Sequence, residues 1–263
     1  MSTAVAAPEH TAAGRPFRYV EHVMGMPISL ALRGRHTDDP QAIEAWAGVM
    51  ADLREVDTVF STYREDSFVS RLGRGEVTVA DCPPEVAEVL ALGEQARLES
   101  GGAFDVRRPG TDGRVVLDPS GVVKGWAVER AAARLHALDD TDFCLSAGGD
   151  MVCHTADPDG APWRIGIEDP SEPSRLLAAV PVRRGGLATS GTAHRGQHLV
   201  VGRDGSVPSR VAQVTVVAGS LTWADIDATA AYALGGEAAD WLRARPGRTG
   251  LVVWADGAVE TVG

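Results

Sequence analysis

The segment from Ser220 to Gly235 is the most tightly specified element of the chain, because its residues define a helix and both of its ends. It opens on capping residues, continues through strong helix formers and stops at a glycine pair. Asp225 and Thr229 are four residues apart, so a carboxylate and a hydroxyl project from one face near the partially positive N-terminal end. Two such oxygen donors suit a hard cation such as Mg²⁺. The alternative is that Asp225 caps or solvates the first turn and Thr229 packs.

Many turns between short elements are expected elsewhere, because the chain contains 30 glycines and 15 prolines. Helical spacing and helix-starting prolines predict helices over residues 38–62, 83–101 and 237–245, and a further helix that starts within residues 118–129 and continues to about residue 138. Alternating or apolar runs predict strands at residues 17–33 in two pieces, 114–117, 143–147, 151–154, 163–168, 176–182, 198–201, 212–217, 250–254 and 259–262.

The small residues of 186–191, which include two hydroxyls, are interpreted as a loop. This pattern favours an α+β fold, a mixed, largely antiparallel sheet with helices packed to one side. We expect a single domain over residues 17–263 behind a disordered tail over residues 1–16.

The formal net charge of −11 argues against general nucleic-acid binding, although a local pocket can still bind a phosphorylated ligand through backbone amides and a metal. Three cysteines without a Cys-x-x-Cys pair argue against a disulfide framework or structural zinc, and Cys144 and Cys153 are expected to pack as small apolar groups. These features, with no signal segment, favour the cytoplasm. The sequence contains no window of about eighteen apolar residues without charge, so we expect no segment to insert into a membrane.

Several polar residues have both a functional and an ordinary interpretation. Lys124, beside a glycine at a helix start, fits an anion site or a solvated surface position. His198 fits a general base or a hydrogen-bonded residue at a strand end. Asp150, after two glycines, is interpreted as a turn former. Thr189 and Ser190 lack the Gly-x-Ser-x-Gly elbow and a paired base, so a hydrolase triad is not expected.

Eight short motifs, in order, give the chain a resemblance to the ApbE family of FAD:protein FMN transferases. No single motif decides the matter, but their shared order makes coincidence improbable. The motifs are Met24-Gly25, Phe60-Ser61-x-Tyr63 with Asp66-Ser67, Gly102-Ala-Phe-Asp105, Leu117-Asp118 with Lys124-Gly125-x-Ala127, Ala147-Gly-Gly-Asp150, Trp163-x-x-Gly166-Ile167-x-Asp169-Pro170, Ala188-Thr-Ser-Gly191 and Ala224-Asp225-x-x-Ala228-Thr229.

The resemblance implies an enzyme that binds FAD with Mg²⁺ at the pyrophosphate. Such enzymes transfer the FMN half to a threonine hydroxyl of an acceptor flavoprotein and release AMP. It implies Asp225, Thr229 and the carbonyl of Val123 as metal ligands, and Lys124 and His198 as catalytic residues. The residues that it implies for FAD binding are Met24, Ser61, Tyr63, Asp105, Lys124, Glu129, Thr189 and Ser190. Taken alone, Tyr63 would be interpreted as a core or capping residue.

One departure from the family pattern concerns the acceptor side. Where members typically carry an Asp-Pro pair, this chain has Val201-Gly202, and Asp204 replaces a threonine. Arg107 also replaces a common threonine. Two alternatives therefore stay open: an FAD-binding carrier or docking protein that has lost transfer, and an FAD pyrophosphatase that gives FMN and AMP.

Overall fold

A single large sheet organises the computed structural model, which describes residues 16–109, 115–191 and 210–263. Its eight strands lie in the order β1-β2-β5-β6-β9-β10-β11-β12, and each neighbouring pair is antiparallel. The strands are β1 Phe17–Val23, β2 Met26–Gly34, β5 Thr141–Ala147, β6 Asp150–His154, β9 Gly185–Gly191, β10 Val211–Ala218, β11 Thr249–Trp254 and β12 Val259–Val262.

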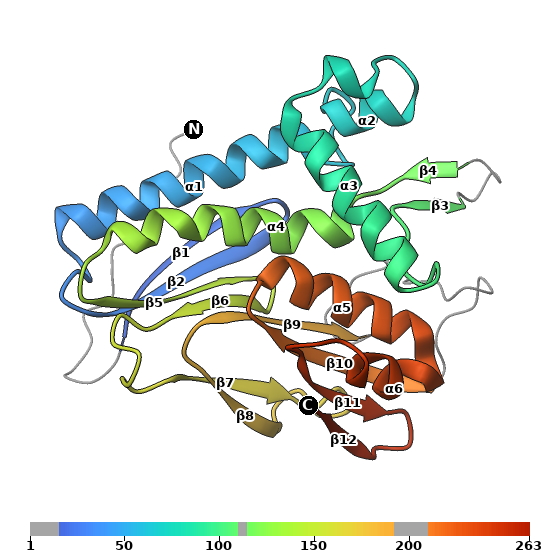
Figure 1. Ribbon diagram of the computed structural model, residues 1–263. Coiled ribbons are helices and arrows are strands. Elements are labelled where there is room, and N and C mark those ends of the chain that lie inside the picture. Colours follow the sequence, from blue (N-terminus) through green and yellow to red (C-terminus); the bar gives the residue numbers. More distant parts are fainter. Residues whose placement is uncertain (1–15, 110–114, 192–209) are drawn as a thin grey trace.

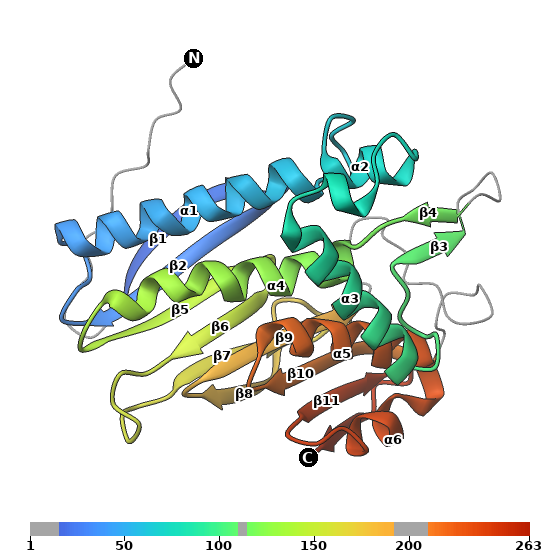
Figure 2. The same ribbon diagram turned by 45° about the horizontal axis from the view of Figure 1, so that its top comes forward.

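Helices cover one face of this sheet. In Figures 1 and 2, α1, α4 and α5 lie over the strands, and α6 lies beside α5 near the end of the chain. The main core forms between this layer and the sheet. The α+β prediction, with helices packed to one side, is therefore confirmed. The helices are α1 Pro40–Phe60, α2 Phe68–Gly73, α3 Pro84–Glu99, α4 Ser120–Ala132, α5 Leu221–Leu234 and α6 Ala238–Arg243, with 3₁₀ turns at Val79–Asp81, Ala133–Ala137 and Gly235–Glu237.

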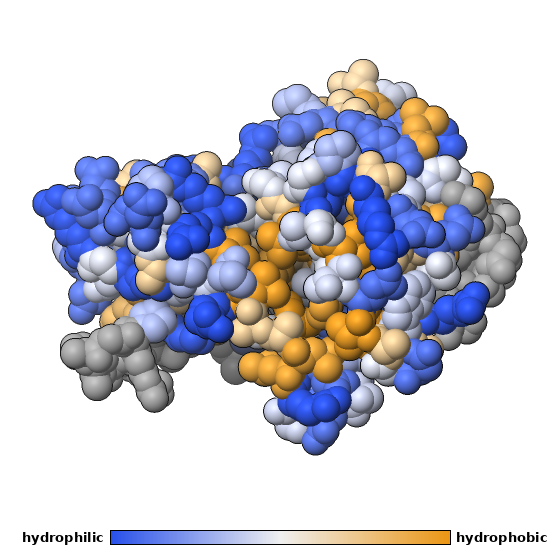
Figure 3. All heavy atoms as spheres, turned by 60° about the horizontal axis from the view of Figure 1, so that its bottom comes forward, coloured by the Kyte–Doolittle hydropathy of each residue, from blue (hydrophilic) through white to orange (hydrophobic). Residues whose placement is uncertain are grey.

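A β-hairpin covers part of the opposite face. It consists of β7 Trp163–Glu168 and β8 Leu176–Val182, and in β7 buried residues alternate with exposed ones. Its buried side packs in a second apolar cluster with side chains from β5, β6, β9 and β11. Figure 3 shows hydrophobic side chains gathered at the centre of this underside. A smaller hairpin, β3 Arg107–Pro109 with β4 Val115–Leu117, projects away from the sheet in Figure 1.

The loop predicted over residues 186–191 is wrong, because these residues form most of the central strand β9. Their small size has a packing reason. A Cβ atom at Gly186 would lie 2.3 Å from the Cα of Leu221, where α5 begins. Strand β9 therefore needs glycine at this point to let the helix approach.

Helix α5 is buried along almost its whole length, including four polar residues. Asp227 is fully buried and pairs with Arg245 at 2.9 Å and Arg248 at 2.7 Å. A buried carboxylate needs charged or hydrogen-bonding partners, and the two arginines provide them. The ion pairs thereby connect α5 to the segment that follows α6. Within the described ranges, no helix combines the length and apolar character needed to cross a membrane.

Candidate active site

The candidate site begins where α4 and α5 approach each other closely, at Gly125. The backbone N–H of Gly125 donates a hydrogen bond of 3.1 Å to Oδ2 of Asp225. A Cβ atom at position 125 would lie 2.9 Å from both the carbonyl oxygen of Leu221 and the Cβ of Asp225. Any side chain here would separate the helices, so glycine is what allows Asp225 to reach the backbone of α4.

Lys124 is placed between two buried carboxylates. Its Nζ contacts Oδ2 of Asp150 and lies 3.4 Å from Oδ1 of Asp225, and each aspartate side chain is only 1% exposed. Burial raises the pKa of Asp150 to about 6; the Lys124 ammonium opposes this shift, and the neighbouring Asp225 adds to it. Asp150 is thus a site residue that the sequence interpretation, as a turn former, missed. The sequence feature that could have indicated this role is the apolar strand on each side of the glycine pair that precedes Asp150.

A tight turn between β5 and β6 positions Asp150. Gly148 and Gly149 both have positive φ, 56° and 98°, as a two-residue hairpin turn requires. Asp150 comes directly after this turn, and its Oδ1 accepts a hydrogen bond of 3.1 Å from the N–H of Thr189. The N–H of Gly148 donates to the carbonyl of Pro27 at 3.3 Å. Residues from the neighbouring pairs β2–β5, β5–β6 and β6–β9 therefore meet at one end of the sheet.

Two pairs of hydroxyl groups extend the polar cluster along β9. Ser190 and Thr229 lie with their hydroxyl oxygens 3.1 Å apart in the buried interior, and Thr189 and Thr215 lie 2.9 Å apart.

The cap of α5 is Ser220, whose Oγ accepts from the N–H of Trp223 at 3.4 Å. The alternative in which Asp225 caps the helix is therefore wrong.

The residues at this point fit a hard divalent cation. Asp150 and Asp225 supply two carboxylates against the single ammonium of Lys124, which leaves a surplus of negative charge when all three are ionised. Among the residues described, no group of three or more His, Cys, Asp or Glu side chains could hold a metal. A cation here would therefore need hydroxyl or carbonyl oxygens as well. Thr229 is one helical turn after Asp225 on α5, and Val123 directly precedes Lys124 on α4.

Glu129 anchors the beginning of α5. Its carboxylate accepts hydrogen bonds from the hydroxyl of Ser220 at 2.7 Å and from the N–H groups of Leu221 at 3.3 Å and Thr222 at 3.1 Å. This is the partially positive end of the helix, where a carboxylate is stabilising. Glu129 also lines a cavity of about 300 Å³ beside Trp126 and the α5 N-terminus.

Other residues that the sequence singled out lie at the periphery. Tyr63 is 80% exposed in the connection after α1, and Met24 is half-buried with a positive φ of 55° in the β1–β2 turn. The carbonyl of Ser61 accepts from the hydroxyl of Ser70 at 3.3 Å, and the exposed Asp105 accepts from the N–H of Arg107 at 2.8 Å.

His198 and the altered Val201-Gly202 pair belong to residues 192–209, which lie outside the described part of the chain. Of the predicted site residues, the structure brings Lys124 and Asp225 together with Asp150, pairs Ser190 with Thr229, and places Tyr63 at the surface.

Comparison with curated proteins finds relatives that carry one name. The chain is 24% identical over 249 residues to the FAD:protein FMN transferase of Haemophilus influenzae, a match spanning 71% of each chain. It is 31% identical to that of Vibrio cholerae over 46% of this chain and 39% of the relative. For that of Rhodobacter capsulatus the identity is 32%, over 62% of this chain and 33% of the relative. The last two matches thus span less than half of the relatives.

Comparison with solved structures identifies the same fold. The ApbE protein of Thermotoga maritima superposes with a TM-score of 0.78 at 19% identity, over 94% of this chain and 97% of that one. The flavinyl transferase ApbE of Pseudomonas stutzeri superposes with a TM-score of 0.76 at 23% identity, over 100% and 97%. The ApbE family model matches residues 24–111 and 108–252, most of the sequence. The chain therefore belongs to the ApbE family.

Proposed function

We propose that this chain is an FAD:protein FMN transferase that uses Mg²⁺, attaches FMN to a threonine hydroxyl of an acceptor protein and releases AMP. The observation that carries the proposal is the buried contact of Lys124 with Asp150 and Asp225 at the α4–α5 approach. Its relatives bear the transferase name, and the cluster provides the charges that phosphoryl transfer from a pyrophosphate needs.

The reaction breaks one bond and forms another at the FMN phosphorus. The threonine oxygen of the acceptor forms a bond to this phosphorus, and the bridging oxygen leaves with AMP. The hydroxyl proton must pass to a base, and we assign that role to His198, whose unperturbed pKa near neutrality suits it. The outcome is a phosphoester-linked FMN on the acceptor.

The described residues bind and orient the pyrophosphate. Lys124 on α4 places a positive charge beside carboxylates from β6 and α5, so it is suited to hold a phosphate oxygen. Asp150 holds Lys124 in place and is held in turn by the Thr189 N–H. Mg²⁺, when bound by Asp225, Thr229 and the Val123 carbonyl, supplies further neutralisation of phosphate charge.

We assign binding of the flavin end of FAD to the exposed aromatic residue Tyr63. Tyr63 is 80% exposed, and an aromatic ring at the surface is a group on which an isoalloxazine can stack. Met24 lies on the turn that adjoins the Gly148 turn, so it is suited to contact the flavin from the sheet side. The α3–α4–α5 cavity near Glu129 offers space of about 300 Å³ for another part of the dinucleotide.

The test is incubation of the protein with FAD, Mg²⁺ and a threonine-containing acceptor peptide, with mass spectrometry of the peptide and quantification of AMP. We expect FMN-modified peptide and equimolar AMP, both abolished by a chelator and by Asp225→Asn. An acceptor peptide with alanine for threonine is the control. AMP without peptide modification would identify a pyrophosphatase, and bound but intact FAD would identify a carrier; either result would overturn the proposed transfer.

A further inference from the structure

Two cysteines lie in contact on the underside of the sheet, away from the Lys124 cluster. Cys144 on β5 and Cys153 on β6 are paired in the antiparallel register, and their sulfur atoms are 3.6 Å apart. Both side chains belong to the second apolar cluster, with exposures of 8% and 2%. All three cysteines of the chain are free thiols in this structure.

The backbone geometry of this pair suits a covalent link. Directly opposed residues of an antiparallel pair have Cα atoms about 4.5–5.5 Å apart, which lies inside the range of roughly 4.4–6.8 Å that disulfides span. The sulfur atoms already face each other, so the bond forms with small side-chain rotations. Cys153 donates its S–H toward the sulfur of Cys144, and this hydrogen bond lowers the pKa of the Cys144 thiol.

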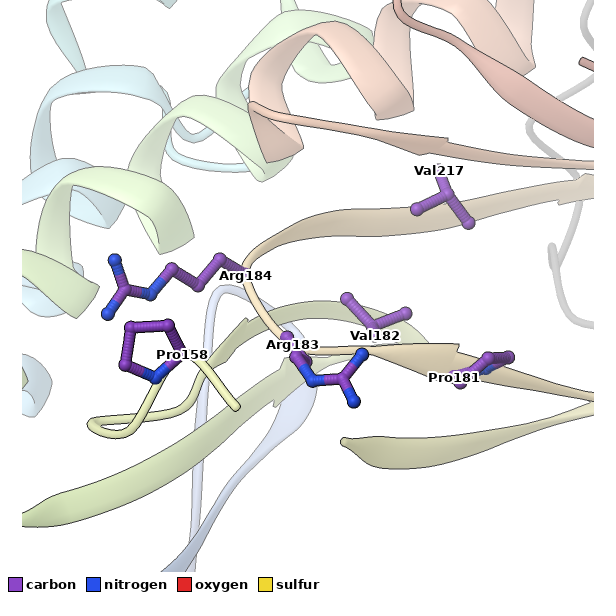
Figure 4. A pocket seen from close by; sticks show the side chains of 6 residues that line it. All are labelled: Pro158, Pro181, Val182, Arg183, Arg184 and Val217. Atoms are coloured by element: carbon purple, nitrogen blue, oxygen red, sulfur yellow. The ribbon is translucent and has the colours of Figure 1, made fainter. Parts of the chain in front are cut away.

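A pocket borders the second apolar cluster, to which both cysteines belong, although neither cysteine lines it. It measures about 340 Å³ and is lined by Pro158, Pro181, Val182, Arg183, Arg184 and Val217 (Figure 4). Gly185, the residue after Arg184, is the register partner of Cys153 on β9. Val182 belongs to the same apolar cluster as both cysteines. The two arginines give the pocket positive charge, which favours an anionic thiol or disulfide reagent.

We propose that Cys144 and Cys153 form a reversible dithiol–disulfide site that reacts with small anionic disulfides of the glutathione type. One cysteine thiolate attacks the small disulfide, forms a mixed disulfide and releases one small thiol. The second cysteine then displaces the other small thiol and forms the Cys144–Cys153 bond. The protein loses two hydrogen atoms, that is two protons and two electrons, and these reduce the small disulfide to two thiols.

This site has a structural consequence for the hairpin above it. Residues 144 and 153 lie on either side of the Gly148–Gly149 turn, and Asp150 follows that turn. A disulfide would close a short loop that contains Asp150 and would restrict the separation of β5 from β6. The oxidised form therefore holds the residue that contacts Lys124 more rigidly, whatever reaction the site performs.

The experiment treats the full-length native chain with oxidised glutathione and measures intact mass, free thiols and a non-reducing peptide map. We expect a mass lower by two hydrogen atoms, loss of two of the three thiols, and one linked peptide pair containing Cys144 and Cys153. The melting temperature should rise by about 5 °C and return on reduction. Cys82→Ser is the matched control and should behave like the parent chain.

The single variants Cys144→Ala and Cys153→Ala should each abolish the mass loss. If either fails to fold, the peptide map of the parent chain still decides the question. The proposal is overturned if the native chain retains three thiols, if the bond forms only after denaturation, or if it joins Cys82 to either partner. Because these readouts need no FAD, failure of the transferase assay leaves them unaffected.

Discussion

Replacement of Gly125 by alanine tests how closely α4 and α5 must approach. The new Cβ would lie 2.9 Å from the Leu221 carbonyl oxygen and from the Asp225 Cβ, and 3.2 Å from the Thr222 Cα. Two of these atoms are backbone and cannot rotate away, so we assign the overpacking a cost of about 2–3 kcal/mol. The higher helix propensity of alanine relative to glycine offsets about 1 kcal/mol of this cost. The free energy of unfolding should therefore fall by about 1–2 kcal/mol.

The assay is denaturant unfolding of the variant and of a matched control, Gly48→Ala in α1. At position 48 the nearest atom would be the Cδ of the half-exposed Arg134 side chain, at 3.5 Å, which is ordinary contact. The control should gain up to about 1 kcal/mol. Gly125→Ala should also weaken Mg²⁺-dependent FAD binding, measured by calorimetry, because it moves Asp225 from Lys124. A Gly125→Ala variant as stable as the parent, or stabilised like the control, would refute the reasoning.

Three further predictions concern single groups of the site. Glu129→Gln should lower the free energy of unfolding by about 1–2 kcal/mol, since a neutral amide replaces the carboxylate at the α5 N-terminus; equal stability in urea would contradict this anchoring role. The folded-state pKa of Asp150, about 6, exceeds its unfolded value, so the folded, metal-free protein binds more protons between about pH 4 and 6. Its stability should therefore fall by about 3 kcal/mol as pH rises through that window, and Asp150→Asn should remove this slope; parallel pH profiles of variant and parent would refute it. Tyr63→Ala should leave stability within about 0.5 kcal/mol, because the side chain is 80% exposed, yet weaken FAD affinity roughly 3- to 10-fold through lost stacking; unchanged FAD titrations would remove Tyr63 from the flavin site.

Elements with clear ends were predictable from the sequence. The N-cap Ser220 and the glycine at 235 delimit α5 where expected, and Pro40 starts α1 directly after its cap, Asp39. Each of these signals is local, so a single sequence contains it. The α+β class followed because apolar patterning assigns most strands without knowledge of their partners.

What the sequence could not provide depends on contacts between distant segments. Residues 186–191 appear loop-like because glycine, alanine, serine and threonine are small, and only the packing of α5 on β9 explains their size. Asp150 was interpreted as a turn former for the same reason: its role depends on Lys124, which lies 26 residues earlier on a different element. The hairpin β7–β8 was predicted as two strands, but nothing local indicates that it covers the underside.

The strand order also determines when the site forms during folding. Strand β2 pairs with β5, so Leu32 lies opposite Phe143, and β6 pairs with β9 rather than with the next strand along the chain. Pairings between residues so far apart require large loops to close before they contribute stability, which slows folding. Asp225 belongs to α5, which packs on β9 and β10. Lys124 and Asp150 can therefore meet Asp225 only after the C-terminal third of the chain has folded onto the sheet, so an incompletely folded chain has no assembled site.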